Sequence, residues 1–117
     1  MKTTKKDFKL FVKECQEWIT VFGLKGWEFR FYHEYTQDED FARTEFQNTA
    51  RWVDIKLHTD WPVKPNEQEI KKAAFHEVLE ILFADLRMIA SSRSFDEQQL
   101  DSEVHKIIHT FESIFFD

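Results

Sequence analysis

The spacing of apolar residues changes twice along this chain of 117 residues, and this change restricts the fold more than any other feature. From about residue 4 to 22, apolar side chains recur every three or four positions, as in an amphipathic helix. From Trp27 to His58 they alternate with polar residues, as in strands with one buried face. Beyond residue 66 the helical spacing returns. This order predicts an α+β domain.

Three strands are expected in the alternating region, over residues 27–35, 42–47 and 52–58. Polar residues at 37–40 and around 47–49 separate them and are typical of turns. Because strands joined by short polar turns usually pair with their neighbours in the chain, we predict a three-stranded antiparallel meander.

Two long helices are predicted to follow the sheet. Asn66 is a suitable N-cap, and Glu69 stands three residues later, as in a capping box. The second helix then runs to about residue 90. The segment 91–94 interrupts it, and a third helix with an apolar stripe reaches about residue 116.

The composition is that of one folded domain over residues 1–117. Apolar residues make up 42% of the chain and aromatic residues 16%, which is enough for a substantial core. A net charge of -6 disfavours nucleic-acid binding, and no apolar run is long enough to predict a membrane helix. The single cysteine, Cys15, cannot form an internal disulfide. A cytoplasmic protein is therefore expected.

The second helix carries a motif of residues that can perform chemistry. His76-Glu77-Val78-Leu79-Glu80 reads H-E-x-x-E, one residue away from the H-E-x-x-H pattern that binds zinc and activates a water. On a helix, His76 and Glu80 lie one turn apart and can share a divalent metal. Glu77 would lie at the edge of that site, and its carboxylate would act as a base. The expected centre of the buried face is formed by Phe75, Leu79, Leu82 and Leu86.

A catalytic zinc usually needs a third protein ligand, and the last helix offers Glu103 and His105 as candidates. The two residues lie about 200° apart on the helix, so they cannot face one point together. The motif also fits an ordinary hydrogen-bonded pair of His76 and Glu80, because five letters with one mismatch arise by chance in many helices.

Several segments together match a known pattern: 26–29 (GWEF), 55–57 (IKL), 74–79 (AFHEVL), 84–87 (ADLR), 103–108 (EVHKII) and 111–112 (FE). With the order helix, strands, helix and helix, they make the chain similar to small zincin-like metallopeptidase-type proteins of bacteriophages and prophages. This resemblance implies that His76 is the first metal ligand and Glu77 the general base. It places Glu80 where the second histidine usually stands, and His105, with Glu103 as the alternative, as the third ligand.

The resemblance implies a metal-dependent hydrolase of the peptidase type, acting in the cytosol of a host cell on a peptide laid along the sheet edge. Zinc is the expected cofactor. The Glu80 carboxylate is a harder donor than imidazole, so manganese or iron are alternatives, and a site that no longer binds metal is another. A non-catalytic phage protein that binds a host or phage protein is the competing hypothesis. A homodimer formed through Phe115 and Phe116 is a third.

Overall fold

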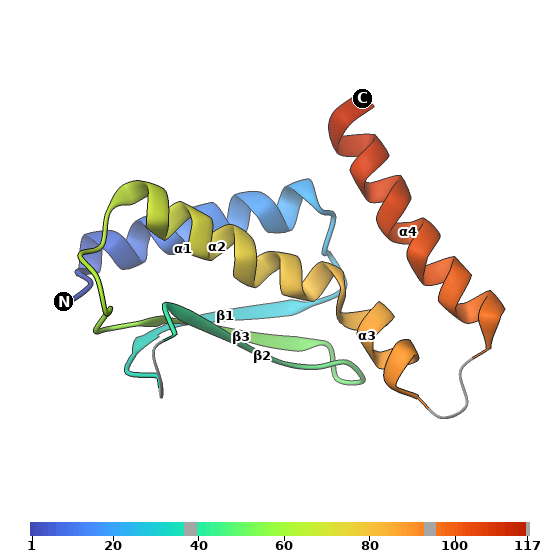
Figure 1. Cartoon of the computed structure of the whole chain (residues 1–117), viewed down its shortest axis with the longest axis horizontal. Helices are drawn as coiled ribbons and strands as arrows, with labels where there is room; N and C mark the ends of the chain where they lie inside the picture. Colours follow the sequence, from blue (N-terminus) through green and yellow to red (C-terminus); the bar gives the residue numbers. More distant parts are fainter. Residues whose placement is uncertain (37–39, 93–95, 117) are drawn as a thin grey trace.

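The computed structural model describes residues 1–36, 40–92 and 96–116. These residues form an α+β fold, as predicted, with the N-terminal helix before the strands and the remaining helices after them (Figure 1). The elements are α1 (Lys5–Val21), β1 (Glu28–Glu34), β2 (Ala42–Gln47), β3 (Trp52–His58), α2 (Glu67–Leu82), α3 (Ala84–Ser91) and α4 (Glu97–Phe116).

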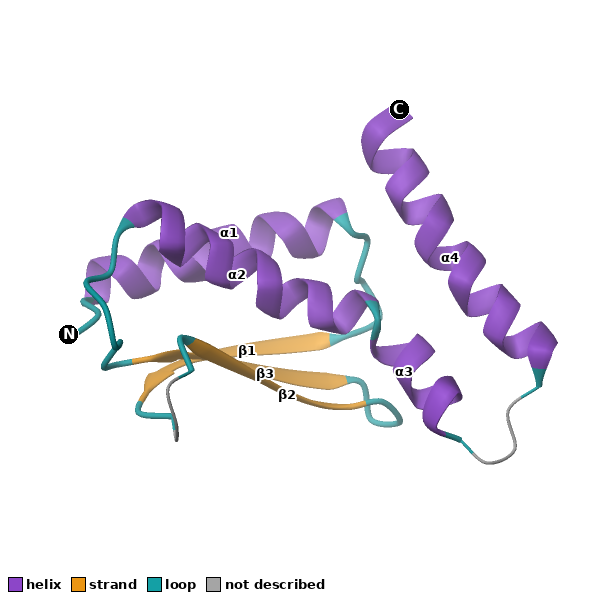
Figure 2. Cartoon of the chain, in the orientation of Figure 1, coloured by secondary structure: helices purple, strands orange, loops and turns teal. Residues whose placement is uncertain are grey.

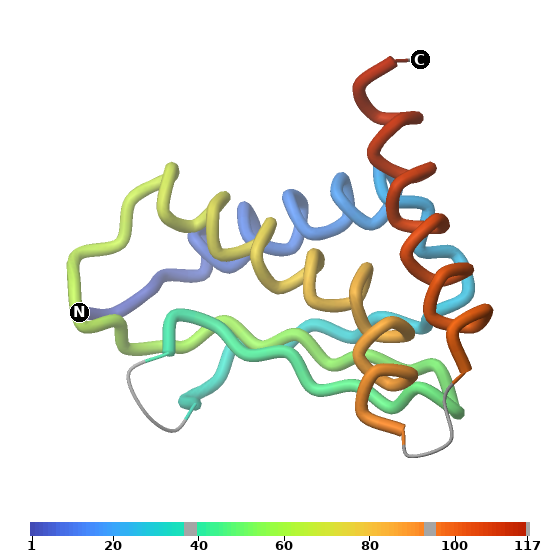
Figure 3. The backbone as a smooth tube through the Cα atoms, turned by 45° about the vertical axis from the view of Figure 1, so that its right-hand side comes forward, coloured from blue at the N-terminus to red at the C-terminus, as the bar shows by residue number. Residues whose placement is uncertain are grey.

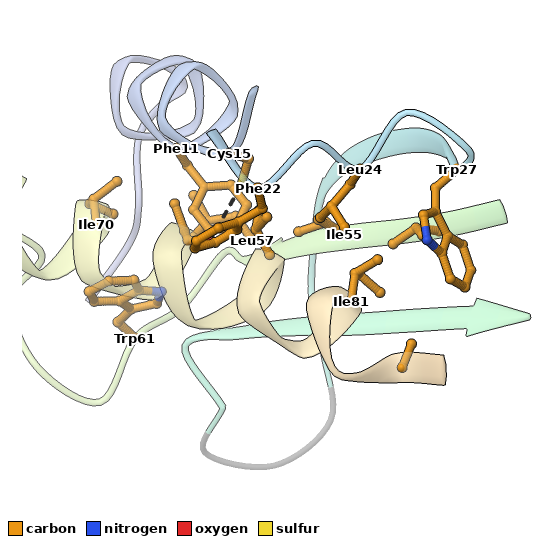
Figure 4. Close-up of a cluster of buried hydrophobic side chains, with 14 residues drawn as sticks. Phe11, Cys15, Phe22, Leu24, Trp27, Ile55, Leu57, Trp61, Ile70 and Ile81 are labelled. Carbon is orange, nitrogen blue, oxygen red and sulfur yellow. Dashed lines mark hydrogen bonds between the residues drawn. The ribbon is translucent and has the colours of Figure 1, made fainter. Parts of the chain in front are cut away.

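The molecule has a layer of helices over one face of a sheet. Helices α1 and α2 lie side by side above the strands, while α3 and α4 continue beyond the end of the sheet (Figure 2). The core lies between these layers and includes Phe11, Cys15 and Trp61, all nearly inaccessible to solvent. In Figure 4 the dashed line marks the Cys15 thiol, which donates to the carbonyl oxygen of Ala74 at 3.9 Å and so joins α1 to α2.

The strand order is β1-β3-β2, so the sheet is mixed, and the antiparallel pairing predicted between the first two strands is absent from it. Strand β3 pairs in parallel with β1 and antiparallel with β2. Contacts of His58, the last residue of β3, account for this strand order. The amide of Thr36, after β1, donates to Nδ1 of His58, and the amide of His58 donates to the carbonyl of Phe41, before β2. The two ends of the β1–β2 connection therefore meet at His58, and β2 starts on the far side of β3.

Alternation along β3 separates an apolar face from a charged one. Val53, Ile55 and Leu57 are completely buried beneath the helices. Asp54 points to the uncovered face, where its carboxylate accepts from Nε of Arg30 on β1 at 2.7 Å. The period of two therefore correctly predicts which face is buried, although it carries no information on strand order.

Capping residues set the helix starts, and Asn66 does so as the sequence predicts. The Thr4 hydroxyl accepts from the amide of Asp7, whose carboxylate in turn accepts from the amide of Thr4, a complete capping box. The Asn66 side chain accepts from the amide of Glu69 at the start of α2. At the start of α4 the Asp96 carboxylate accepts from the amide of Gln99.

The predicted helix from 66 to 90 is interrupted at Phe83, which separates α2 from α3. The Phe83 backbone has φ −95° and ψ 0°, and its amide is 3.4 Å from the carbonyl of Leu79, a long hydrogen bond. No glycine or proline marks the break, so the sequence gives no signal for it. The break lets α3 turn toward the β2–β3 connection.

Arg51 fastens that connection to α3. Its guanidinium Nη1 donates to the Asp85 carboxylate at 2.7 Å, and the guanidinium carbon lies 3.9 Å from the centre of the Trp27 ring. The Asn48 amide donates to the same carboxylate at 3.2 Å. Arg51 has a φ of 60°, a left-handed conformation that is costly for residues other than glycine.

Helix α4 extends away from the layer of α1 and α2, and the C-terminus lies at its far end (Figures 1 and 3). It packs on α3, and the Phe111 ring meets the edge of the Phe22 ring at 6.5 Å. None of its residues is buried, and Phe115 and Phe116 are 73% and 86% exposed. Among the described helices, none has the length and apolar character that crossing a membrane requires.

Substitutions at Arg51 test this contact. We expect Arg51→Ala to lower the free energy of unfolding by about 1–2 kcal/mol, because it removes the ion pair and the ring contact but keeps the strained φ. Arg51→Gly is expected to be about 1 kcal/mol more stable than Arg51→Ala, because glycine adopts positive φ without strain. Urea unfolding of the three proteins measures both differences. Equal stability of the two variants would show that the backbone at residue 51 is unstrained.

Candidate functional site

A pocket of about 470 Å³ lies between α2 and the first half of β2. Its walls combine ionisable side chains from the helix with the backbone and side chains of the strand. The residues that line it are Asp40, Phe41, Ala42, Arg43 and Thr44 from the strand side, and Glu69, Lys72, Ala73, His76, Glu77 and Glu80 from the helix.

The register of the sheet places this pocket. Thr44 pairs with Ile55, a buried residue of β3, so Thr44 lies on the face that the helices cover. Strand β2 lies at an edge of the sheet and, within the described strands, pairs only with β3. The pocket therefore opens beside a strand edge whose backbone groups can bind another extended chain.

Glu77 is a buried carboxylic acid at this pocket. It is 6% exposed and shares the sheet-facing side of α2 with Ala74, Val78 and Ile81. Burial, followed by the charges of Glu80 and Asp40, raises the pKa of Glu77 to about 7, and a hydrogen bond from Thr44 opposes this rise in part. Glu77 can therefore exchange a proton near neutral pH.

The position of Glu77 differs from the sequence-based expectation. The predicted centre of the buried face is only partly buried, at Phe75, Leu79, Leu82 and Leu86 alike. Phe75 packs edge-on against Trp18 of α1, with ring centres 4.8 Å apart. Helix α2 is covered on two sides, by α1 and by the sheet, and the more deeply buried side is the one that carries Glu77. A single apolar stripe on a helical wheel cannot separate these two sides.

His76 and Glu80 lie on the outer side of the same helix. The His76 side chain is 72% exposed, and its Nε2 lies 3.6 Å from a carboxylate oxygen of Glu80. The other carboxylate oxygen of Glu80 accepts from Nη1 of Arg87 at 2.9 Å. Glu80 is therefore paired both with His76, which lines the pocket beside it, and with Arg87 of α3.

The two candidates for a third ligand lie elsewhere. His105 binds the backbone carbonyl of Asp101 within α4, with Nδ1 and the oxygen 2.9 Å apart. The Glu103 carboxylate accepts from Lys106 at 2.9 Å and borders a different cavity, of about 180 Å³. Neither residue lines the pocket that holds His76. Over residues 1–36, 40–92 and 96–116, no three histidine, cysteine or acidic side chains are grouped so that they could hold a metal ion.

Asp40, Thr44 and Lys72 are among the pocket residues that were not singled out from the sequence. Asp40 ends a polar run interpreted as a turn, and Thr44 is an ordinary residue within a strand. Lys72 precedes His76 by four residues, so its place on the same side of the helix follows from helical spacing. The other two could not be placed without knowing that β2 lies beside α2.

Comparison of the chain with protein-family models, with curated proteins and with solved structures gives no match. The resemblance to zincin-like proteins therefore stays a prediction, which rests on the residues that carry it.

The ionisation of Glu77 predicts how stability depends on pH. The folded-state pKa of about 7 lies above the ordinary value of 4.5, so the folded protein favours the neutral acid. This contribution is complete below the ordinary pKa and is lost as pH rises through about 7, an effect of about 3 kcal/mol. Urea unfolding at several pH values should show that wild type loses stability relative to Glu77→Gln, in which residue 77 does not titrate.

Glu80→Gln is the matched variant for this test. It removes one of the charges that raise the pKa of Glu77, so it should reduce the pH dependence while keeping the buried acid. Parallel curves for wild type and Glu77→Gln would contradict a raised pKa.

Proposed function

We propose that this protein is a hydrolase of the peptidase type, with Glu77 as its general base. The observation that carries the proposal is the buried acid itself: Glu77 lies in a pocket, beside a strand edge, with a pKa of about 7. A base with this pKa is partly ionised at neutral pH and can both take up and release a proton during a reaction.

An extended polypeptide is the substrate that suits this pocket. The outer backbone groups of β2 can pair with a peptide added as a further strand, and such pairing positions a peptide without reading its sequence. Thr44 lies on the sheet face that helix α2 covers, and its hydroxyl donates to the backbone carbonyl oxygen of Glu77 at 3.4 Å. A peptide bond held over Thr44 would therefore lie close to the Glu77 carboxyl group.

A metal at this site stays a prediction of the resemblance. His76 and Glu80 supply one nitrogen and one carboxylate donor, one helical turn apart. Catalytic zinc usually takes three protein ligands, and Glu80 would first have to release Arg87. The described residues therefore do not fit a complete zinc site, and the proposed role of Glu77 does not depend on one.

Metal analysis and peptide cleavage test the hydrolase together. If the resemblance holds, protein purified without chelator retains zinc, manganese or iron, and His76→Ala and Glu80→Ala lose it. His105→Ala should retain the metal, because His105 lies on α4, outside the pocket. Cleavage of a fluorogenic peptide library should fall at least about 100-fold in Glu77→Gln.

Retention of metal by His76→Ala would contradict the proposed ligand. Absence of cleavage by wild type with each of the three metals supplied would contradict the hydrolase.

A second candidate is a non-catalytic protein that binds a polypeptide in the same pocket. The pairing of Glu80 with Arg87 and the exposure of His76 favour it, because both residues are satisfied by protein and solvent. The exposed Phe115 and Phe116 at the end of α4 favour self-association in either case. For both candidates we propose a phage-encoded protein acting in the host cytosol. A Glu77→Gln variant that folds and still binds its peptide but loses function would contradict the hypothesis of a non-catalytic binding protein.

A further inference from the structure

A second groove, of about 970 Å³, lies between α1 and β1, at the opposite edge of the sheet from the pocket of Glu77. Four lysines of α1 border it, and an aromatic pair forms part of its floor. These residues are Lys5, Lys6, Lys9 and Lys13, with Phe8 and His33.

The lysines of helix α1 gather on one side of its first turns, and Glu17 follows on that side one turn after Lys13. At about 100° per residue, Lys5, Lys9 and Lys13 fall within about 80° of one another, whereas Glu14 lies on the opposite side. Glu14 faces α2, where its carboxylate lies 3.9 Å from Nζ of Lys71. Of the described residues, none forms an ion pair with the four lysines of the groove. A chain with a net charge of -6 thus places four lysines around one groove, with Asp7 near its His33 and Glu17 beyond its end.

The floor of the groove is held in place by contacts to β1 and β3. The Phe8 ring stacks on His33 with centres 5.1 Å apart and planes 6° apart. Nε2 of His33 lies 2.7 Å from the hydroxyl of Thr3, which donates to the carbonyl oxygen of His58. An apolar surface is therefore fixed between the lysines and the strand.

The strand beside this floor can accept another strand. β1 lies at the sheet edge and pairs with β3 alone among the described strands, so its outer backbone groups face away from the sheet. Phe29 and Phe31, which alternate with exposed residues, continue the partly apolar band along β1. Backbone donors and acceptors at regular spacing match an extended polypeptide and do not match the sugar-phosphate chain of a nucleic acid.

We propose that this groove binds an acidic, extended segment of a partner protein, laid along β1. Carboxylates of the segment would pair with the lysines of α1, and apolar side chains alternating with them would cover Phe8 and its neighbours. The charge of the groove selects the acidic residues, and the strand edge selects the extended conformation. This surface is separate from the Glu77 pocket and does not depend on the proposed hydrolase.

A labelled decapeptide of alternating glutamate and leucine is the probe, with fluorescence anisotropy as the readout. We expect Lys9→Glu/Lys13→Glu to weaken binding at least tenfold. The control is Lys25→Glu/Lys64→Glu, which makes the same change in net charge at residues outside the groove, and it should bind like wild type. Thermal unfolding of both variants checks that they fold.

Amide chemical shifts of wild type provide a test that needs no variant. Adding the peptide should shift the amides of β1 and the first turns of α1. Shifts confined to β2, equal binding by the two double variants, or equal competition by a ten-nucleotide oligothymidylate would each overturn the proposal. The last result would assign the lysines to a nucleic acid.

Discussion

The complete burial of one face of β3 is the constraint on which the rest of the structure depends. Val53, Ile55 and Leu57 are inaccessible to solvent, and α1 and α2 pack over them. Strands β1 and β2 each pair with β3, and among the described residues they do not pair with each other. Each therefore forms one edge of the sheet. The pocket at β2 and the groove at β1 are two results of this one arrangement.

Glu77 is an ionisable residue buried among these apolar side chains, which is an unfavourable position for a carboxylate. A carboxylic acid on the most buried side of a central helix costs stability whenever it ionises, and an alanine or leucine there would not. Local departures from good packing are expected where a residue has another role. Burial raises the pKa of this same carboxyl to about 7, which links its cost to the chemical use proposed for it.

Local features of the fold could be predicted from the sequence, whereas relations between distant segments could not. The cap at Asn66 depends only on a residue three positions later in the chain, and it is confirmed. The strand order depends on where the β1–β2 connection meets His58, which no spacing reveals. The break at Phe83 lacks glycine or proline. It brings Asp85 of α3 into contact with Arg51, which lies far away in the chain. Likewise, a histidine in the last helix could not be located relative to the pocket before the direction of α4 was known.

The position of β3 in the chain has a consequence for how the protein folds during synthesis. The two outer strands are made first, yet each finds its partner only in the strand made last. Until residue 58 has left the ribosome, both carry apolar faces and unpaired backbones, which are the features that promote wrong association. Sheet formation therefore has to wait for β3, and the pairing of β1 with β3 is the non-local step that is expected to limit the folding rate.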